Sequence, residues 1–359
     1  GLPTRAHLSK QLAKAHVGAG NIKQAIQVLE ELFPTSAPAS EDQLDLDAAN
    51  MLFECYLADS DYAAAEEGLL KTREWLLRLK VDLPIELSVR LGICKLRLSG
   101  LEAAQSFFEP LFASHDPARP NVPRDPDLVY EAAEALFAVE EHTEALRFYE
   151  HAAADETFNT PLVWFKLGLC QRAIGQEKQA LATFEQVHKK EPEDSEVRLI
   201  LSELYSLQGR AQDALEILGA VSGPEQTASK RGHDPTVVTA VRLRAQRGLL
   251  LFDVDKIDEF VDLCLPLINA KPRRRLGPQP TRAGTYTATS LTDMLGQDTH
   301  FEMFSKLCRG LLRLRRPTDA GHLVNAALSN SHFPGQKHRH QLRLLAVTAA
   351  MIGGELTDA

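Results

Sequence analysis

The sequence predicts an all-α fold in which helix–turn–helix units stack one after another. A pattern of small, bulky and turn-forming residues runs from Pro161 to Pro192 and resumes 34 residues later. Small residues in similar surroundings recur along much of the chain at intervals of 34 to 41 residues, and at longer intervals after Ala214. No stretch shows the alternation of apolar and polar residues that is typical of a β-strand. These observations favour a solenoid of helical repeats over a fold with a central core.

The clearest unit has a physical reason for each of its marked positions. Its residues are Trp164, Leu167, Gly168, Gly175, Ala180, Phe184 and Pro192. Gly168 and Ala180 are small because the two helices of the unit cross closely there. Gly175 ends the first helix, and Pro192 follows the second, which it could not continue. A period of 34 with these residue types is the signature of the tetratricopeptide repeat, or TPR.

The small residue in the second helix of each unit traces the repeats along the chain. It is Ala25, Ala65, Ala104, Ala145, Ala180 and Ala214, followed less clearly by Phe260 and Ala320. The sequence therefore predicts about eight repeats in a right-handed TPR superhelix. The tail Gln341–Ile352 resembles the first helix of a further repeat, so we expect the chain to be a piece of a longer protein.

Charge divides the predicted array into two parts. Residues 1–228 form an acidic array of about six repeats, with 21 Lys and Arg against 37 Asp and Glu. Residues 229–359 hold 19 against 12 and form a basic, degenerate part. Its first repeat is predicted as helices at 235–252 and 257–268, followed by a loop near 271–290 without an apolar period. Either the two parts bind different kinds of partner, or they differ only in the charge of their solvent-exposed faces.

The cysteine pattern favours reduced thiols inside an intracellular protein. The five cysteines are Cys55, Cys94, Cys170, Cys264 and Cys308. Each stands alone within a predicted helix, and none forms a C-x-x-C pair. The sequence shows no signal peptide or transmembrane run.

Motifs for catalysis are missing from the sequence. It contains no phosphate-binding loop, nucleophile elbow, zinc-protease motif or dinucleotide fingerprint. His338 and His340 are two positions apart, so on a helix they do not face one ligand. We therefore expect no enzymatic activity, cofactor, metal or small-molecule ligand.

A groove lined by the first helices is the predicted partner site. Residues at i, i+3 and i+7 of each first helix should point into it. In the middle of the array the predicted contacts are Tyr130, Glu134, Phe165, Leu169, Leu199 and Glu203. An apolar strip flanked by carboxylates suits a basic amphipathic helix or an extended peptide. The alternative is that Phe165 and Tyr130 pack under a neighbouring loop.

Towards the C-terminus the corresponding positions become basic. The predicted patch consists of Arg242, Arg273, Arg274, Arg275, Arg309 and Arg313. Clustered guanidinium groups without acids beside them favour phosphate or an acidic peptide. For the loop arginines, a basic localisation signal and a plain solvated loop remain alternatives.

Three segments resemble the TPR subunit of general transcription factor IIIC. They are Leu2–Lys10, Leu44–Tyr56 and Leu83–Cys94. The resemblance implies a nuclear, non-catalytic scaffold for transcription by RNA polymerase III. Its implied partners are the other transcription factor IIIC subunits and transcription factor IIIB, with promoter DNA reached mainly through the complex.

Two further functions remain open on the sequence. One is a TPR scaffold in another intracellular assembly, such as a complex for RNA decay, ubiquitin ligation or transport. The other is direct binding of nucleic acid through the basic C-terminal part.

Overall fold

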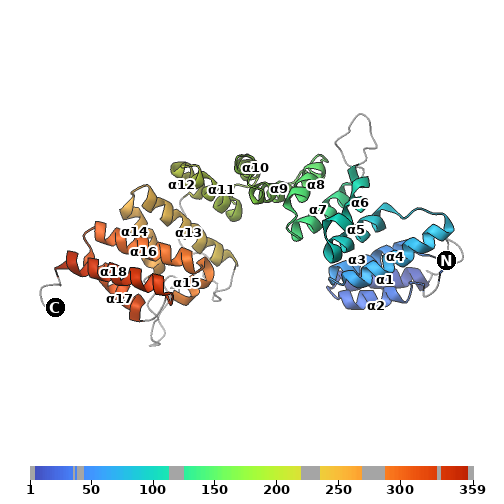
Figure 1. Cartoon of the computed structure of the whole chain (residues 1–359), viewed down its shortest axis with the longest axis horizontal. Helices are drawn as coiled ribbons and strands as arrows, with labels where there is room; N and C mark the ends of the chain where they lie inside the picture. Colours follow the sequence, from blue (N-terminus) through green and yellow to red (C-terminus); the bar gives the residue numbers. More distant parts are fainter. Residues whose placement is uncertain are drawn as a thin grey trace. The chain divides into compact units, whose positions relative to one another are not determined.

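A computed structural model describes residues 5–34, 37–38, 44–112, 125–219, 235–268, 288–329 and 333–354. These residues form helices joined by turns and contain no β-strand, so the predicted all-α TPR solenoid is confirmed. They fall into two compact units, Gly1–Thr183 and Phe184–Ala359. Figure 1 shows the succession of helix pairs along the chain.

The first unit consists of helices that pack in consecutive pairs. They are α1 (Arg5–Gly18), α2 (Ile22–Glu30), α3 (Leu46–Ala58), α4 (Tyr62–Leu79), α5 (Ile85–Ser99), α6 (Leu101–Phe108), α7 (Pro126–Ala138), α8 (His142–Ala152) and α9 (Pro161–Ala173). A 3-10 turn, η2 (Glu109–Phe112), extends α6, and α10 (Glu177–Lys190) spans the boundary of the two units. The first helices also contact one another, α3 with α5 and α5 with α7, which is the stacking of a solenoid.

The second unit continues the alternation. Its helices are α11 (Ser195–Leu207), α12 (Ala211–Leu218), α13 (Pro235–Asp253), α14 (Ile257–Ile268), α15 (Ala288–Leu295), α16 (Gln297–Arg313), α17 (Pro317–Ser329) and α18 (Gln336–Gly353). The pairs are α11 with α12, α13 with α14, and α16 with α17. Pro266 lies inside α14, which nevertheless continues for two residues beyond it.

The predicted repeat register is visible in burial. We call the small residues that traced the repeats, from Ala25 to Ala320, the crossing residues. All eight, including Phe260, are 0% exposed. The residue twelve positions earlier, which we call the facing residue, is also buried in every repeat. The facing residues are Ala13, Phe53, Gly92, Ala133, Gly168, Ser202, Gly248 and Cys308.

The turn inside each repeat has one backbone conformation. In seven of the repeats the residue five positions before the crossing residue has a positive φ of 56–80°. These turn residues are Gly20, Ser60, Glu140, Gly175, Gly209, Asp255 and Arg315. Glycine adopts this left-handed conformation without cost, whereas the other residue types are strained there. The turn is therefore set by the packing of the two helices as well as by glycine.

At Gly92 and Gly248 the facing position requires glycine, because the second helix of the repeat comes very close there. A Cβ atom placed on Gly92 would lie 2.7 Å from Cε1 of Phe108 and 2.8 Å from Cβ of Phe107. At Gly248 it would overlap Sγ of Cys264. These short separations show how tightly the two helices of a repeat cross.

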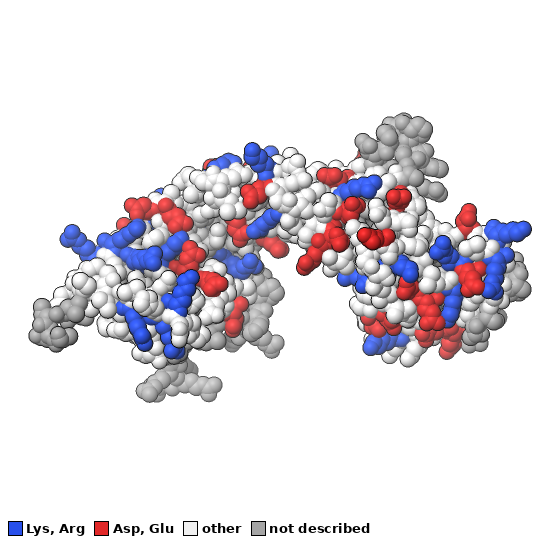
Figure 2. Space-filling view, in the orientation of Figure 1, with Lys and Arg blue, Asp and Glu red and all other residues white. Residues whose placement is uncertain are grey.

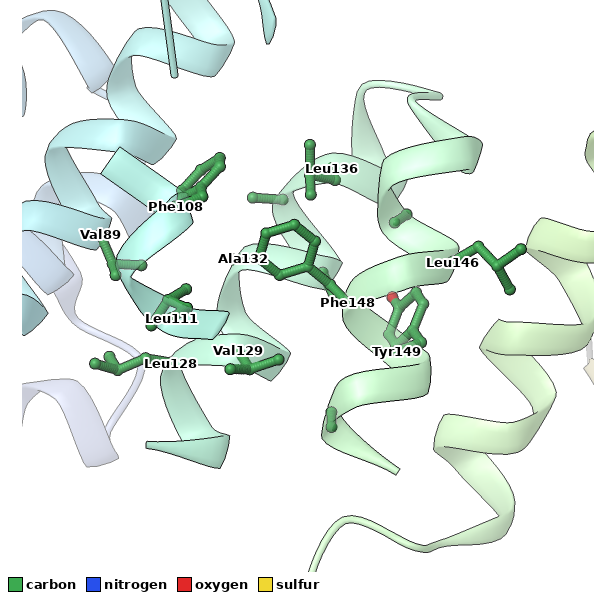
Figure 3. Packing of buried hydrophobic residues seen from close by; sticks show 14 of the residues in the cluster. Val89, Phe108, Leu111, Leu128, Val129, Ala132, Leu136, Leu146, Phe148 and Tyr149 are labelled. Carbon is green, nitrogen blue, oxygen red and sulfur yellow. The ribbon is translucent and has the colours of Figure 1, made fainter. Parts of the chain in front are cut away.

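The core of the first unit is continuous from α5 to α9. Val89, Phe108, Val129 and Tyr149 belong to one buried cluster that draws on successive repeats (Figure 3). The rings of Phe108 and Phe148 meet edge to face, with their centroids 5.8 Å apart. From α5 to α9 each repeat therefore shares its apolar surface with the next.

Two arginines complete the C-terminal end of the short helix α12. Arg198 of α11 donates from Nε to the carbonyl oxygen of Ile217 at 3.0 Å, and from Nη2 to that of Leu218. Arg247 of α13 donates to the carbonyl oxygens of Leu215, at 3.2 Å, and Gly219. The carbonyl oxygen of Leu215 also accepts a hydrogen bond from the backbone N–H of Gly219. The last carbonyls of a helix otherwise lack backbone donors, so the arginines supply them, and their positive charges interact favourably with the negative end of the helix dipole.

The structure contains one helix that the sequence did not predict. Helix α15 begins at Ala288, inside the segment 271–290 that was expected to be a loop. Residues 269–287 lie outside the described residues. The helix was missed because it precedes α16 without belonging to the repeat pattern. The division at residue 228 into an acidic and a basic part remains a prediction about charge.

Candidate interaction surfaces

Ion pairs link the first helices of the first unit step by step. Nζ of Lys10 on α1 lies 2.9 Å from Asp45, whose side chain also caps α3. Nζ of Lys166 on α9 lies 3.2 Å from Glu134 on α7. Between them, Arg90 on α5 joins α3 to α7. We call this series the first-helix ladder, and it connects helices that are one repeat apart.

Arg90 is the buried step of the ladder. It pairs with Glu54 on α3, and its Nε lies 3.8 Å from Oε1 of Glu131 on α7. The arginine is only 4% exposed. Burial raises the pKa of Glu131; Arg90 opposes this effect and Glu54 adds to it. A buried cation between two carboxylates leaves this part of the ladder with a negative balance, consistent with a surface for cationic partners.

Two of the predicted groove residues of the first unit, Tyr130 and Glu134, contact side chains outside the predicted set. Oε1 of Glu134 accepts a hydrogen bond from the hydroxyl of Tyr149 at 2.5 Å. The ring of Tyr130 lies 5.4 Å from that of Phe158, in the turn after α8, and 6.2 Å from that of Tyr149. Tyr130 is thus half-buried against a neighbouring turn, the alternative that the sequence left open for it.

Phe165 and Leu169 lie on α9 and are both half-buried. They therefore keep part of their apolar surface open to a partner. In the second unit, Leu199 is 7% exposed and packs within the unit, while Glu203 is half-buried. Among the apolar groove residues, open surface is found at Tyr130, Phe165 and Leu169.

The basic positions of the second unit differ in their neighbours. Arg242 and Arg309 are exposed. Nη1 of Arg313 instead lies 3.1 Å from Asp255, and the guanidinium group stands 5.0 Å from the ring centre of Phe252. The expectation that these arginines have no acids beside them therefore does not hold for Arg313. Arg273, Arg274 and Arg275 lie outside the described residues.

Lys306 is also paired. Its Nζ lies 2.8 Å from Asp253 and 3.1 Å from Glu302. Burial alone would lower the pKa of Lys306, but the hydrogen bonds and charges of these carboxylates outweigh it and raise the pKa. Figure 2 shows that Lys and Arg gather on the visible face of the second unit near α16 and α18. Part of that positive charge is balanced by the acids of α13 and the following turn.

The described residues show neither a metal-binding cluster nor an exposed thiol. They contain no group of three or more His, Cys, Asp or Glu side chains placed to hold a metal ion. All five cysteines are buried and unpaired, and burial raises the pKa of Cys94, Cys264 and Cys308 to about 12. These thiols are therefore poor nucleophiles. No helix within the described part of the chain is long and apolar enough to cross a membrane.

The helix pairs, their crossing residues and their left-handed turns define a TPR protein. A family model described as a tetratricopeptide repeat matches residues 173–233. Beyond the repeat class, the sequence resembles the TPR subunit of transcription factor IIIC. General transcription factor 3C polypeptide 3 of Homo sapiens is 23% identical over 283 residues, 73% of this chain. The transcription factor tau 131 kDa subunit of Saccharomyces cerevisiae is 32% identical over 124 residues, 34% of this chain.

The chain spans only part of these relatives, 30% of the human protein and 12% of the yeast protein. Among solved structures, YrrB is described as a TPR protein with an unusual peptide-binding site. It is 17% identical, with a TM-score of 0.40, over 63% of this chain and 92% of YrrB. PilF of Pseudomonas aeruginosa is also 17% identical with a TM-score of 0.40, over 63% of this chain and 91% of PilF.

Proposed function

We propose that the chain is a non-catalytic scaffold within transcription factor IIIC, where it docks sister subunits for transcription by RNA polymerase III in the nucleus. The observation that carries this proposal is the similarity to the human factor 3C polypeptide over 73% of the chain. The yeast tau subunit supports it over a shorter stretch at higher identity. A TPR array suits such a role because stacked repeats offer extended concave surfaces.

The partner surface that we propose in the first unit combines open apolar side chains with carboxylates. Phe165 and Leu169 provide the apolar part, and Tyr130 contributes the exposed part of its ring. Glu54 and Glu134 provide the acidic part, and the side chain of Glu54 is about half exposed. This combination fits a segment with apolar anchors and basic flanks. In the second unit, Glu203 would offer a further carboxylate, whereas the predicted contact Leu199 is buried.

The partners follow from the proposed complex. Sister subunits of transcription factor IIIC are the main ones, with transcription factor IIIB as a further partner. Promoter DNA is contacted mainly through the complex. Direct nucleic-acid binding has weaker support, because Lys306, Arg313 and Arg316 are each paired with a carboxylate.

Purification of the tagged full-length protein from nuclear extract tests the proposal. We expect the other transcription factor IIIC subunits to co-purify in near-stoichiometric amounts and to remain bound through gel filtration. Recovery of the subunits of a different assembly, without transcription factor IIIC, would replace the proposal with the general TPR-scaffold alternative. A second test is chromatin immunoprecipitation. If the proposal is correct, this experiment should find the protein at transfer-RNA-type genes.

A further inference from the structure

Helix α4 has a second apolar face on the side that points away from its own repeat. The buried residues of its inner face are Ala65, Leu69, Thr72, Trp75 and Leu76. On the opposite side, Leu70 is 40% exposed and Leu77 is 67% exposed. The two leucines are seven positions apart, about two turns, so they lie on one line along the helix. A surface helix normally has one apolar face, which is buried, so a second one indicates a binding surface.

The place of α4 in the array leaves this face open. It is the second helix of an interior repeat, with α1 and α2 before it and α5 and α6 after it. It contacts α3 of its own repeat and α5 of the next. Repeats of a solenoid stack side by side, so the repeats before and after α4 do not cover the outer face of this second helix. Within the described part of the chain, the two leucines therefore stay accessible.

The outer face of α4 contains a hollow with the geometry of a coiled-coil hole. Its lining residues are Leu70, Arg73, Glu74 and Leu77, with Arg78 beside them. The first four stand at i, i+3, i+4 and i+7. These are the four positions that surround one side chain of a facing helix when two helices pack knobs into holes. The arrangement therefore favours a helix over an extended peptide as the occupant.

Two unpaired cations border one side of the leucine line. Arg73 and Lys80 are exposed, and neither has an ion-pair partner among the residues that the structure describes. Each stands three positions after one of the two leucines. On the other side, the charges of Lys71 and Arg78 are balanced by ion pairs with glutamates of the same helix. One flank of this face is therefore positive, although the array around it is acidic.

We propose that the outer face of α4 binds an acidic amphipathic helix of a partner protein. One large apolar side chain of that helix fills the hollow between Leu70 and Leu77. Carboxylates on one flank of the partner helix meet Arg73 and Lys80. The face belongs to a second helix, whereas the proposed groove is formed by first helices. The inference therefore does not depend on which complex the scaffold serves.

A second copy of the chain is a poorer occupant of this face. When two identical helices pair antiparallel about a two-fold axis, the same flank of each helix meets in the interface. Arg73 and Lys80 of one copy would then lie against the same cations of the other copy, and like charges repel. We therefore expect this face to leave the chain monomeric.

Two synthetic peptides test this inference. Both are fluorescein-labelled 18-residue helices with the same line of leucines, but one carries four glutamates beside the leucines and the other four lysines. Titration with the 359-residue chain, followed by fluorescence anisotropy at low salt, should show binding of the acidic peptide. We expect the basic peptide to bind at least tenfold more weakly, and higher salt to reduce the difference.

Variants of the chain assign the binding to α4. Leu77→Asp should weaken binding of the acidic peptide at least tenfold, because it places a negative charge at the hollow. Leu207→Asp is the matched control, since Leu207 is 69% exposed on α11 and should not affect the peptide. Phe165→Ala should also leave binding unchanged, which separates this face from the proposed groove. Circular dichroism checks that each variant keeps its helical content.

A charge variant tests the cationic flank. Arg73→Glu together with Lys80→Glu should remove the preference for the acidic peptide. Lys178→Glu together with Lys189→Glu changes the net charge by the same amount at exposed positions of α10 and should keep the preference.

Four results would each overturn the inference. The first is that the acidic peptide does not bind, and the second is that Leu77→Asp binds it as well as the parent chain. The third is that the variant of Arg73 and Lys80 keeps the preference. The fourth is that sedimentation shows a dimer of the parent chain which Leu77→Asp abolishes, because a second copy would then be the occupant.

Discussion

Non-glycine residues in the left-handed turns show that helix packing can impose a strained backbone conformation. Ser60, Glu140, Asp255 and Arg315 adopt φ values of 56–63° although none is glycine. A non-glycine residue in this conformation is strained by about 1–2 kcal/mol. The turn persists because the helices on either side bury a crossing residue and a facing residue against each other.

Glu140 offers a test of this strain. Glu140→Gly removes the steric conflict but gives the unfolded chain more freedom, so the two effects partly cancel. We expect the free energy of unfolding of the first unit to rise by about 0.5–1 kcal/mol. The measurement is the urea midpoint, followed by circular dichroism at 222 nm.

Gly175→Ala is the matched opposite change. Gly175 has a φ of +80° in the equivalent turn, with open space around the site of a new Cβ atom. This variant should therefore lose stability through backbone strain alone. A midpoint that falls for Glu140→Gly, or rises for Gly175→Ala, would contradict the strain argument.

At the scale of elements, the closeness of the two helices in a repeat is the main packing constraint. Ala180 is 0% exposed and Gly168 is buried on the neighbouring helix. The hydroxyl of Thr183 on α10 donates to Oε1 of Gln171 on α9 at 2.8 Å, which links the same two helices. A larger residue at Ala180 therefore has no space without moving a helix.

We expect Ala180→Leu to destabilise the protein by roughly 1–3 kcal/mol through overpacking. Ala182→Leu is the control, because Ala182 is exposed on the same helix and gains the same side chain. Thermal unfolding followed by circular dichroism should show a lower midpoint for the first variant only. Equal midpoints for the two variants would mean that the repeat register is wrong.

The sequence predicted the repeated elements because their pattern comes from contacts within a single repeat. The helix expected at 257–268 has the bounds of α14, and the first helix expected at 235–252 becomes α13, which ends one residue later. The predicted tail helix is found as α18, with its start five residues earlier. Helix α15 could not be predicted in the same way, because it has no counterpart in the other repeats.

Contacts between repeats were less accessible to sequence reasoning. The arginine cap on α12 joins three helices, with Arg198 and Arg247 49 positions apart in the chain. The pairing of Arg313 with Asp255 and the burial of Leu199 also depend on how neighbouring helices pack. A position pattern predicts which face a residue occupies, but it does not predict which side chain from the next repeat lies there.

At the scale of the whole molecule, the proposed groove should depend on Phe165. We expect Phe165→Ala to weaken partner binding by roughly 2 kcal/mol while leaving the helical content unchanged, since an aromatic anchor dominates such contacts. The readout is the amount of sister subunit retained by the tagged protein after a salt wash. Leu207→Ala, which shortens an exposed leucine on α11, is the control. Equal retention by the Phe165 variant and the parent would exclude this part of the groove.

The basic C-terminal part should bind acidic protein in preference to DNA. The whole chain has a net charge of −9, which disfavours approach to a polyanion, and its sequence contains no DNA-reading motif. Changing Arg273, Arg274 and Arg275 together to glutamate should abolish binding of an acidic sister-subunit segment and flatten its salt dependence. Stability should remain nearly the same, because the sequence predicts these arginines in a segment without an apolar period, and solvated charges contribute little to folding.

A charge-matched variant separates this local effect from the change in net charge. Lys178, Lys189 and Lys190 are exposed on α10, and their replacement by glutamate changes the net charge by the same amount. This control should keep the acidic segment bound, because its lysines lie outside the predicted basic patch. Titrations of both variants against the acidic segment and against duplex DNA, at several salt concentrations, distinguish the outcomes. Tighter binding of DNA than of the acidic segment by the parent chain would reverse the preference. Binding of neither at low salt would leave the loop arginines as a solvated surface.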